Sequence, residues 1–222
     1  MRTAAFFDLD GTLLTVNSAG LWIRRERRLR RVRKRDMAQA ALLLGGYHLG
    51  FLDMERALRV ALAPLRGKPE AEVCAETQVW WREDVRRYIA PGGRAIVEAH
   101  RRRGDLLVLL TSSSRYASEM AHEEFGLDHC LFQQYEVRDG LFTGEPVRPI
   151  CYGAGKVEIA EQWARTVGVD IEQSSFYSDS TTDIPMLERV RHPFAVNPDP
   201  RLSFTARRRG WPRLDWRRAA PP

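Results

Sequence analysis

Two carboxylates stand two residues apart near the start of the chain, directly after an apolar run. These are Asp8 and Asp10, and Gly11 follows them. Residues i and i+2 of a strand share one face, so a strand over 3–7 followed by a loop would bring both carboxylates to the crevice at the carboxyl end of a sheet. Two close carboxylates repel each other unless a cation or a shared proton relieves them, which predicts Mg²⁺ at this turn. An acidic N-capping turn, with Asp10 as the cap, is the alternative.

A second acidic pair lies near the C-terminus. Asp179 follows the short apolar run Phe176-Tyr177, and Asp183 comes four residues later, before a predicted helix over 184–190. An N-cap for that helix would account for Asp183. It does not account for Asp179, which lies before the turn.

Two further groups suit an anion such as a phosphate. Thr111, Ser112 and Ser113 end the apolar run DLLVLLT and lead into a predicted helix, where hydroxyls and free N–H groups can bind an oxyanion. An ordinary serine N-cap explains the same residues equally well. Lys156 opens a predicted helix over 156–167 after two glycines, and a solvated lysine is the ordinary interpretation of such a position.

Short apolar runs alternate with longer helical stretches along the chain, which is typical of an α/β fold with a parallel sheet covered by helices on both faces. The first two predicted strands are continuous apolar runs, as expected for strands buried on both faces. The predicted strands are Thr3–Phe7, Asp105–Thr111, Leu131–Tyr135, Ser175–Ser178 and Phe194–Val196.

About a hundred residues separate the first two strands, far more than a crossover helix needs. The excess predicts an insertion over 16–89 that is helical throughout, with Pro64 and the Gly67-Lys68-Pro69 turn as internal breaks. The α/β core then comprises 1–15 and 90–222. With 222 residues, 44% of them hydrophobic, the chain can bury a core of this size, which excludes a long disordered protein.

Taken in order, the four polar groups resemble the four signature motifs of the haloacid dehalogenase superfamily, and the resemblance covers nearly the whole chain. The insertion after the first motif is similar to the helical cap of its phosphoserine-phosphatase-like subfamily, subfamily IB. The stretches 139–156 and 192–199 are similar to that subfamily as well. The motifs are D-x-D-G-T at Asp8, Asp10, Gly11 and Thr12, the strand-terminal hydroxyl at Thr111, the lysine at Lys156, and D-x-x-x-D at Asp179 and Asp183.

The resemblance implies a Rossmann-like core and a phosphatase that hydrolyses a small phosphate monoester through an aspartyl-phosphate. Asp8 would attack phosphorus, and Asp10 would protonate the leaving alcohol and then deprotonate water. The resemblance further implies that Asp8, Thr111, Ser112, Ser113 and Lys156 bind the phosphoryl group, and that Asp8, Asp10 through its backbone carbonyl, Asp179 and Asp183 hold Mg²⁺.

One position departs from that pattern. Phosphoserine phosphatases that resemble this chain carry a glutamate nine residues after the nucleophile, where this chain has the uncharged Asn17. The substrate ammonium would lose an ion pair, which disfavours phosphoserine itself. Histidinol phosphate, phosphocholine-like esters, other phosphoserine-like esters and lysophosphatidate remain open.

The charge is concentrated in two patches. Residues 24–35 carry a net charge of +8 and residues 201–218 one of +6, so the remaining chain has a net charge of −8. A nucleic-acid-binding protein with a basic surface along its whole body is therefore not expected. As a helix, 24–35 would be basic all round, which is usual for a solvated face. Next to the uncharged stretch Met37–Leu52 it also suits peripheral contact with an anionic membrane, and a non-enzymatic or regulatory module that binds such a surface is the alternative function.

The remaining features predict little chemistry. Three separated cysteines, Cys74, Cys130 and Cys151, and the absence of a signal-peptide pattern lead us to expect a cytoplasmic protein. The histidine spacing predicts no metal site. Trp80 and Trp81 are expected to pack in the insertion, and one of them can face the cleft. The oligomeric state is left open.

Overall fold

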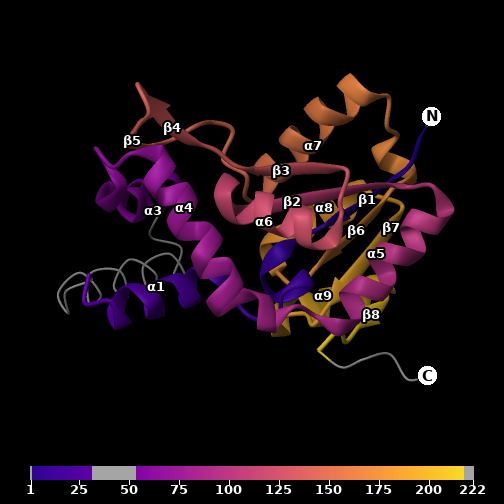
Figure 1. The fold of residues 1–222 in the computed structure, drawn as a ribbon. Coiled ribbons are helices and arrows are strands. Elements are labelled where there is room, and N and C mark those ends of the chain that lie inside the picture. Colours follow the sequence, from indigo (N-terminus) through magenta and orange to yellow (C-terminus); the bar gives the residue numbers. More distant parts are fainter. Residues whose placement is uncertain (1, 32–53, 218–222) are drawn as a thin grey trace.

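The computed structural model describes residues 2–31 and 54–217. Its centre is a six-stranded parallel sheet in the order β3-β2-β1-β6-β7-β8, with β1 among the inner strands (Figure 1). The predicted α/β class is confirmed. The strands are β1 (Ala4–Phe7), β2 (Leu106–Ser114), β3 (His129–Gln133), β6 (Ser175–Ser178), β7 (His192–Val196) and β8 (Arg213–Leu214).

Helices cover both faces of this sheet, because alternate residues of each buried strand point to opposite sides. Phe7 and Leu109 pack with helices α5 (Pro91–Arg103) and α6 (Arg115–Phe125) on one face. Phe6 and Val108 pack with α7 (Ala154–Val167), α8 (Ile184–Arg189) and α9 (Pro200–Arg209) on the other. The apolar strands are thus buried on both faces, as their continuous hydrophobic runs indicated.

The structure corrects the strand boundaries on the outer part of the fold. The strand predicted at Leu131–Tyr135 begins two residues earlier, and an antiparallel hairpin of β4 (Tyr135–Arg138) and β5 (Leu141–Pro146) follows it. The hairpin turn is Asp139-Gly140, and both residues have positive φ. An Asp-Gly pair between two strands is the sequence signal for such a turn, and we had interpreted it only as part of the family pattern.

The described part of the insertion is helical, as expected. It contains α1 (Ser18–Arg28), α3 (Met54–Leu62) and α4 (Glu70–Trp80), followed by short helical turns at 81–88. These helices lie to one side of the sheet with the β4–β5 hairpin beside them (Figure 1). The stretch Met37–Leu52 lies outside the described residues.

The hairpin joins the core to the insertion. The turn between α3 and α4 pairs with it: Gly67 N–H donates to the Phe142 carbonyl at 2.8 Å, and Glu70 N–H donates to the Gly140 carbonyl at 2.8 Å. Phe142 is buried against Val73 of α4. The division of the chain into a core and a cap at 15/16 and 89/90 remains a prediction.

Most arginines in the described part of the run are exposed, as expected of a solvated face, although three of them pair with acids of the insertion. Arg28 forms two hydrogen bonds with Asp84, at 3.1 and 3.0 Å, and Arg25 bonds to the same carboxylate at 3.2 Å. Arg31 pairs with Glu76 at 2.5 Å. One side of the run is therefore neutralised by acids of the same insertion. Residues 32–35 of the run are outside the described part.

The two tryptophans of the insertion both pack inward. Trp80 and Trp81 are 3% and 2% exposed and belong to the same hydrophobic cluster as Phe7. The idea that one of them faces a cleft is wrong, because apolar residues of the core and of the insertion cover both rings. Of the helices described, none is long and apolar enough to cross a bilayer.

Candidate active site

The acidic residues of the first and last motifs meet at the carboxyl ends of β1 and β6. These strands are neighbours, and their pairing continues past β1, since Asp8 N–H donates to the Tyr177 carbonyl at 2.9 Å. The chain leaves β1 towards β2 on one side and β6 lies on the other, so this crevice is where the strand order reverses. Ligands bind at such switch points in doubly wound sheets. The structure thus brings together Asp8 and Asp179, which are 171 positions apart in the sequence.

Gly11 lies where the backbone passes close to the Asp179 carboxylate. Its φ is +75°, and a Cβ atom there would lie 2.1 Å from an Asp179 carboxylate oxygen. No side chain fits, so glycine is required both by the backbone conformation and by the neighbouring carboxylate.

Lys156 lies buried between two carboxylates and is not solvated. Its Nζ contacts Asp8 Oδ1 at 2.8 Å and Asp183 Oδ2 at 2.7 Å, and the Lys156 side chain is 3% exposed. Burial alone would lower the pKa of Lys156, but the charges of Asp183 and Asp8 outweigh it and hold the pKa above its ordinary value. The lysine therefore stays charged and fixes the position of Asp8.

The side chain of Asp183 does not cap the helix that follows it, so the N-cap role that its sequence position suggested is wrong. Its side chain makes no capping bond to α8 and instead binds Lys156 and accepts a 2.7 Å hydrogen bond from Ser178 Oγ. Its other oxygen, Oδ1, is buried without a hydrogen-bond partner.

The negative charge at this edge exceeds what Lys156 can balance. Burial raises the pKa of Asp8 to about 7, with Lys156 opposing and Asp183 adding to the shift. Burial and the charges of Asp8 and Asp183 raise the pKa of Asp179 to about 8. Each carboxylate makes ionisation of the other more costly, which is the arrangement that a bound cation relieves.

These residues fit a divalent cation. Asp8, Asp179 and the Asp10 backbone carbonyl would supply the oxygen ligands that Mg²⁺ prefers, and the raised pKa values of Asp8 and Asp179, caused first by burial and then by neighbouring carboxylates, are consistent with a site that a cation would stabilise. Within 2–31 and 54–217 no three side chains of His, Cys, Asp or Glu are grouped as a metal site, so the carbonyl would be needed as a ligand. Asp183 is committed to Lys156 and Ser178 and would act in support.

Asp10 has a different environment from Asp8, although only Leu9 separates them. Its Oδ1 accepts a 2.7 Å hydrogen bond from Ser18 N–H, and its Oδ2 accepts from Ser18 Oγ at 3.0 Å and Ser113 Oγ at 3.2 Å. Burial raises the pKa of Asp10, and the hydrogen bonds from Ser18 and Ser113 oppose that shift. The Asp10 carboxylate is thus held by neutral donors, whereas the Asp8 carboxylate is held by the lysine.

The hydroxyl residues at the end of β2 divide into two roles. Thr111 is buried, and its Oγ1 accepts a 3.1 Å hydrogen bond from Ser113 N–H. Ser112 is exposed at the strand end. The Ser113 hydroxyl donates to Asp10, so both donors of Ser113 are engaged within the protein and its predicted contact with phosphate finds no support in this geometry. The N-cap of α6 is Ser114, whose side chain accepts from Ala117 N–H.

Sequence reasoning missed several supporting residues. Ser178, which holds Asp183, and Ser18, which holds Asp10, are serines with no distinctive spacing. Asn197 donates to the Gly11 carbonyl at 3.0 Å, and Asp199 accepts from Thr181 N–H at 2.6 Å, so they brace the loops that carry Asp10 and Asp179. Both lie in the 192–199 stretch that we noted only for its family resemblance.

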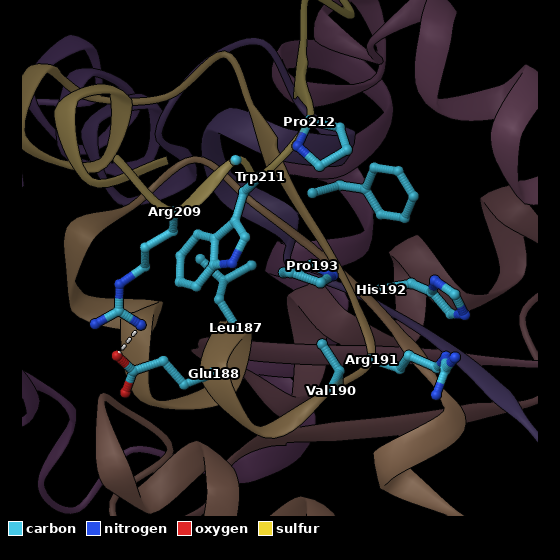
Figure 2. Close-up of a pocket in the computed structure, with 11 residues that line it drawn as sticks. Leu187, Glu188, Val190, Arg191, His192, Pro193, Arg209, Trp211 and Pro212 are labelled. Carbon is cyan, nitrogen blue, oxygen red and sulfur yellow. Dashed lines mark ion pairs between the residues drawn. The ribbon is translucent and has the colours of Figure 1, made fainter. Parts of the chain in front are cut away.

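A separate surface cavity of about 500 Å³ lies elsewhere, beside the first residues of β7 (Figure 2). It is lined by Leu187, His192, Arg209 and Trp211 among others. Because the strands are parallel, the start of β7 is at the opposite end of the sheet from Asp8 and Asp179. This cavity therefore has no part in the candidate active site.

Comparisons with known proteins agree with this geometry. A model of the family described as haloacid dehalogenase-like hydrolase matches residues 5–188. "Histidinol-phosphatase" of Neisseria meningitidis serogroup C (strain 8013) is 30% identical over an alignment of 222 positions that covers 98% of this chain and 100% of that protein. "Phosphoserine phosphatase SerB1" of Mycobacterium tuberculosis (strain ATCC 25618 / H37Rv) is 34% identical over 98% of this chain and 72% of its own length. The crystal structure of a protein of unknown function from Bordetella pertussis Tohama I, 32% identical, matches with a TM-score of 0.89 over 97% of this chain and 99% of that one.

Proposed function

Because the chain belongs to the haloacid dehalogenase-like hydrolases, we propose that it is a magnesium-dependent phosphatase that hydrolyses a small phosphate monoester through an aspartyl-phosphate on Asp8. The observation that carries this proposal is the buried cluster at the end of β1. Lys156 holds one oxygen of Asp8 at 2.8 Å, while the carboxylate of Asp10 is held separately by neutral donors. Two carboxylates in such different environments suit the two roles of nucleophile and proton carrier.

In the first half of the reaction, a carboxylate oxygen of Asp8 attacks phosphorus as the bond to the leaving oxygen breaks. Asp10, in its protonated form, gives its proton to the leaving oxygen, so that an alcohol and not an alkoxide departs. Thr111, the N–H of Ser112 and Lys156 are the groups of this chain that would bind the phosphoryl oxygens.

In the second half, Asp10 takes a proton from water as that water attacks the phosphorus of the aspartyl-phosphate. The bond to Asp8 breaks, phosphate leaves, and the Asp8 carboxylate and the protonated Asp10 are restored. Mg²⁺, when bound by Asp8, Asp179 and the Asp10 carbonyl, supplies positive charge that offsets the repulsion between a carboxylate and a phosphate dianion.

We propose histidinol phosphate as the first substrate to test, ahead of phosphoserine. The relative that carries the histidinol-phosphatase name matches this chain over essentially the full length of both. Both esters carry an ammonium, but only phosphoserine also carries a carboxylate, and the serines that bond to Asp10 offer no cation to pair with it. Asn17 accepts a 3.1 Å hydrogen bond from Gly20 N–H and caps α1, and Ser18 and Ser113 are occupied by Asp10.

The alternative of a non-enzymatic surface-binding module loses support. It rests on free positive charge in the arginine run, and three of the described arginines, Arg25, Arg28 and Arg31, bind acids of the insertion. Lysophosphatidate as a substrate depended on the same membrane contact and becomes the least favoured of the candidate esters. The cytoplasmic location rests on the sequence alone and stays a prediction.

The test is phosphate release by the purified chain from histidinol phosphate, phosphoserine and lysophosphatidate, each with Mg²⁺ or with EDTA. We expect Mg²⁺-dependent release that is fastest with histidinol phosphate and absent in Asp8→Asn. Release that persists in EDTA would contradict the mechanism. Release from phosphoserine alone would contradict the substrate order and leave the mechanism standing.

A further inference from the structure

The carboxylate of Asp10 is gripped at both oxygens by a single residue of the insertion. Ser18 N–H donates to Oδ1 at 2.7 Å, and Ser18 Oγ donates to Oδ2 at 3.0 Å. Ser18 is the first residue of α1 and is 4% exposed, so both donors are shielded from bulk water, whereas the Asp10 acceptor is half-buried. Asn17 caps the same helix and thereby fixes the backbone that carries the Ser18 N–H.

A two-point grip does more than a single hydrogen bond. One bond leaves a carboxylate free to turn about that contact, whereas donors on both oxygens fix its position and the orientation of its plane. Proton transfer requires an oxygen aimed at the reacting group, and a misplacement of about 1 Å costs on the order of a hundredfold in rate. Ser113 Oγ adds a third donor from the core, at 3.2 Å from Oδ2.

We infer that Ser18 is a positioning residue: it orients Asp10 for proton transfer and so makes the acid–base step depend on the first helix of the insertion. This inference rests on the proposed function, in which Asp10 exchanges protons with the leaving group and with water. The chemistry of Asp8 needs no contact with Ser18, so the two carboxylates depend on different parts of the molecule.

The test compares two phosphate esters that differ in their need for a proton. 4-Nitrophenyl phosphate releases a stable phenolate, whereas an alkyl ester such as glycerol 2-phosphate releases an alkoxide that must be protonated. The ratio kcat/KM reports only the steps up to formation of the aspartyl-phosphate and departure of the leaving group. For Ser18→Ala we expect kcat/KM to fall roughly tenfold with the alkyl ester and less than about threefold with the aryl ester.

Ser118→Ala is the matched control. Ser118 is a fully buried serine on α6 whose hydroxyl has no hydrogen-bond partner within the described residues, and it lies outside the catalytic groups. Removing its hydroxyl should leave kcat/KM unchanged with both esters. If Ser18→Ala instead left part of the protein misfolded, kcat/KM would fall by the same factor with both esters, because only the fraction of active protein would change.

A double-mutant cycle completes the test. If Ser18 acts through Asp10, adding Ser18→Ala to Asp10→Asn should cause no further loss with the alkyl ester. Additive losses, or equal losses with both esters in the single variant, would overturn the inference. If the parent protein hydrolyses neither ester in the presence of Mg²⁺ and no other phosphate ester from the substrate panel, the proposed function itself fails, and that outcome is distinguishable from either result with the variants.

Discussion

Two ionic clusters of this protein have opposite charge balances. In the insertion, two arginines, Arg25 and Arg28, bind the single carboxylate of Asp84. Burial would raise the pKa of Asp84, but the hydrogen bonds and charges of Arg28 and Arg25 outweigh it and lower that pKa. At the sheet edge, the single cation Lys156 faces Asp8 and Asp183, with Asp179 beside them.

This difference in charge balance distinguishes a cluster that stabilises the fold from one that is expected to bind a ligand. The cluster around Asp84 leaves no carboxylate unpaired, since Arg25 also bonds to Glu83, and it holds α1 against the turn that follows α4. The cluster around Lys156 keeps an excess of negative charge in a buried place, and this costs stability in the ligand-free protein. Such a cost is retained where a cation and a phosphoryl group are to be bound. The comparison leads to four predictions, from the largest expected effect to the smallest.

Asp8→Asn should abolish turnover, with a loss of more than about 10³-fold, because an amide is a poor nucleophile and a weaker metal ligand. The change is nearly isosteric and removes one of the repelling charges, so the metal-free variant should unfold at the same temperature as the parent or higher. Phosphate release and thermal unfolding in EDTA measure the two effects. Activity above a few per cent of the parent would contradict the assignment of Asp8 as the nucleophile.

Lys156→Ala should reduce turnover by about 10²–10³-fold, because a preorganised cation is lost from the phosphoryl oxygens. It should also lower the free energy of unfolding by about 3–5 kcal/mol, since Asp8 and Asp183 are left buried without their partner. Arg28→Ala is the matched change in the insertion, and it should leave kcat within about twofold. Urea unfolding and kcat, measured on both variants, separate the two clusters; equal effects on kcat would remove the distinction drawn here.

Mg²⁺ should stabilise the protein more as the pH rises. The unfolded chain releases the protons of Asp8 and Asp179 near pH 4, whereas the folded chain holds them to about pH 7 and about pH 8. As the pH rises from about 4 to about 8, the metal-free fold therefore loses the stability that these two protonated groups contribute. Mg²⁺ binds only the ionised carboxylates, so its stabilising effect grows over the same range. The rise in melting temperature caused by Mg²⁺ should be larger at pH 8.5 than at pH 5.5.

Asp179→Asn provides the control for that measurement. Removing one of the two repelling carboxylates should abolish most of the pH-dependent gain and raise the Mg²⁺ concentration needed for half-maximal activity. A gain from Mg²⁺ that does not depend on pH in the parent protein would show that the two carboxylates are not the metal ligands.

Asp84→Asn should have the smallest effect on catalysis. It removes the charge that Arg25 and Arg28 share but keeps an oxygen acceptor, so we expect a loss of about 1–3 kcal/mol in the free energy of unfolding and no change in kcat beyond about twofold. Chemical denaturation and steady-state kinetics on the same preparation check this. A large loss of kcat with unchanged stability would mean that this cluster, too, serves the reaction.

The sequence was informative wherever polar residues end an apolar run. Asp8 and Asp179 could be placed at strand ends because strands buried on both faces read as continuous hydrophobic stretches, and parallel strands end at the same edge. Thr111 was also expected at a strand end, but β2 continues to Ser114. Lys156 and Asp183 were harder, because a lysine at the start of a helix and an acid before one are both common on surfaces. Their family resemblance pointed to the site, but only the structure shows the ion pair between them.

By itself, then, the sequence determined the fold class, since this follows from the alternation of apolar runs and helical stretches, and its resemblance to a known family indicated the residues that we expect to carry the chemistry. The tertiary structure decided which groups hold those residues. Ser18 grips Asp10 and Ser178 grips Asp183, yet isolated serines carry no distinctive pattern. Arg28 reaches Asp84 across 56 positions of the sequence, so part of an apparently free basic run is paired within the insertion. Contacts of this kind depend on how separate elements pack, and neither periodicity nor local spacing contains that information.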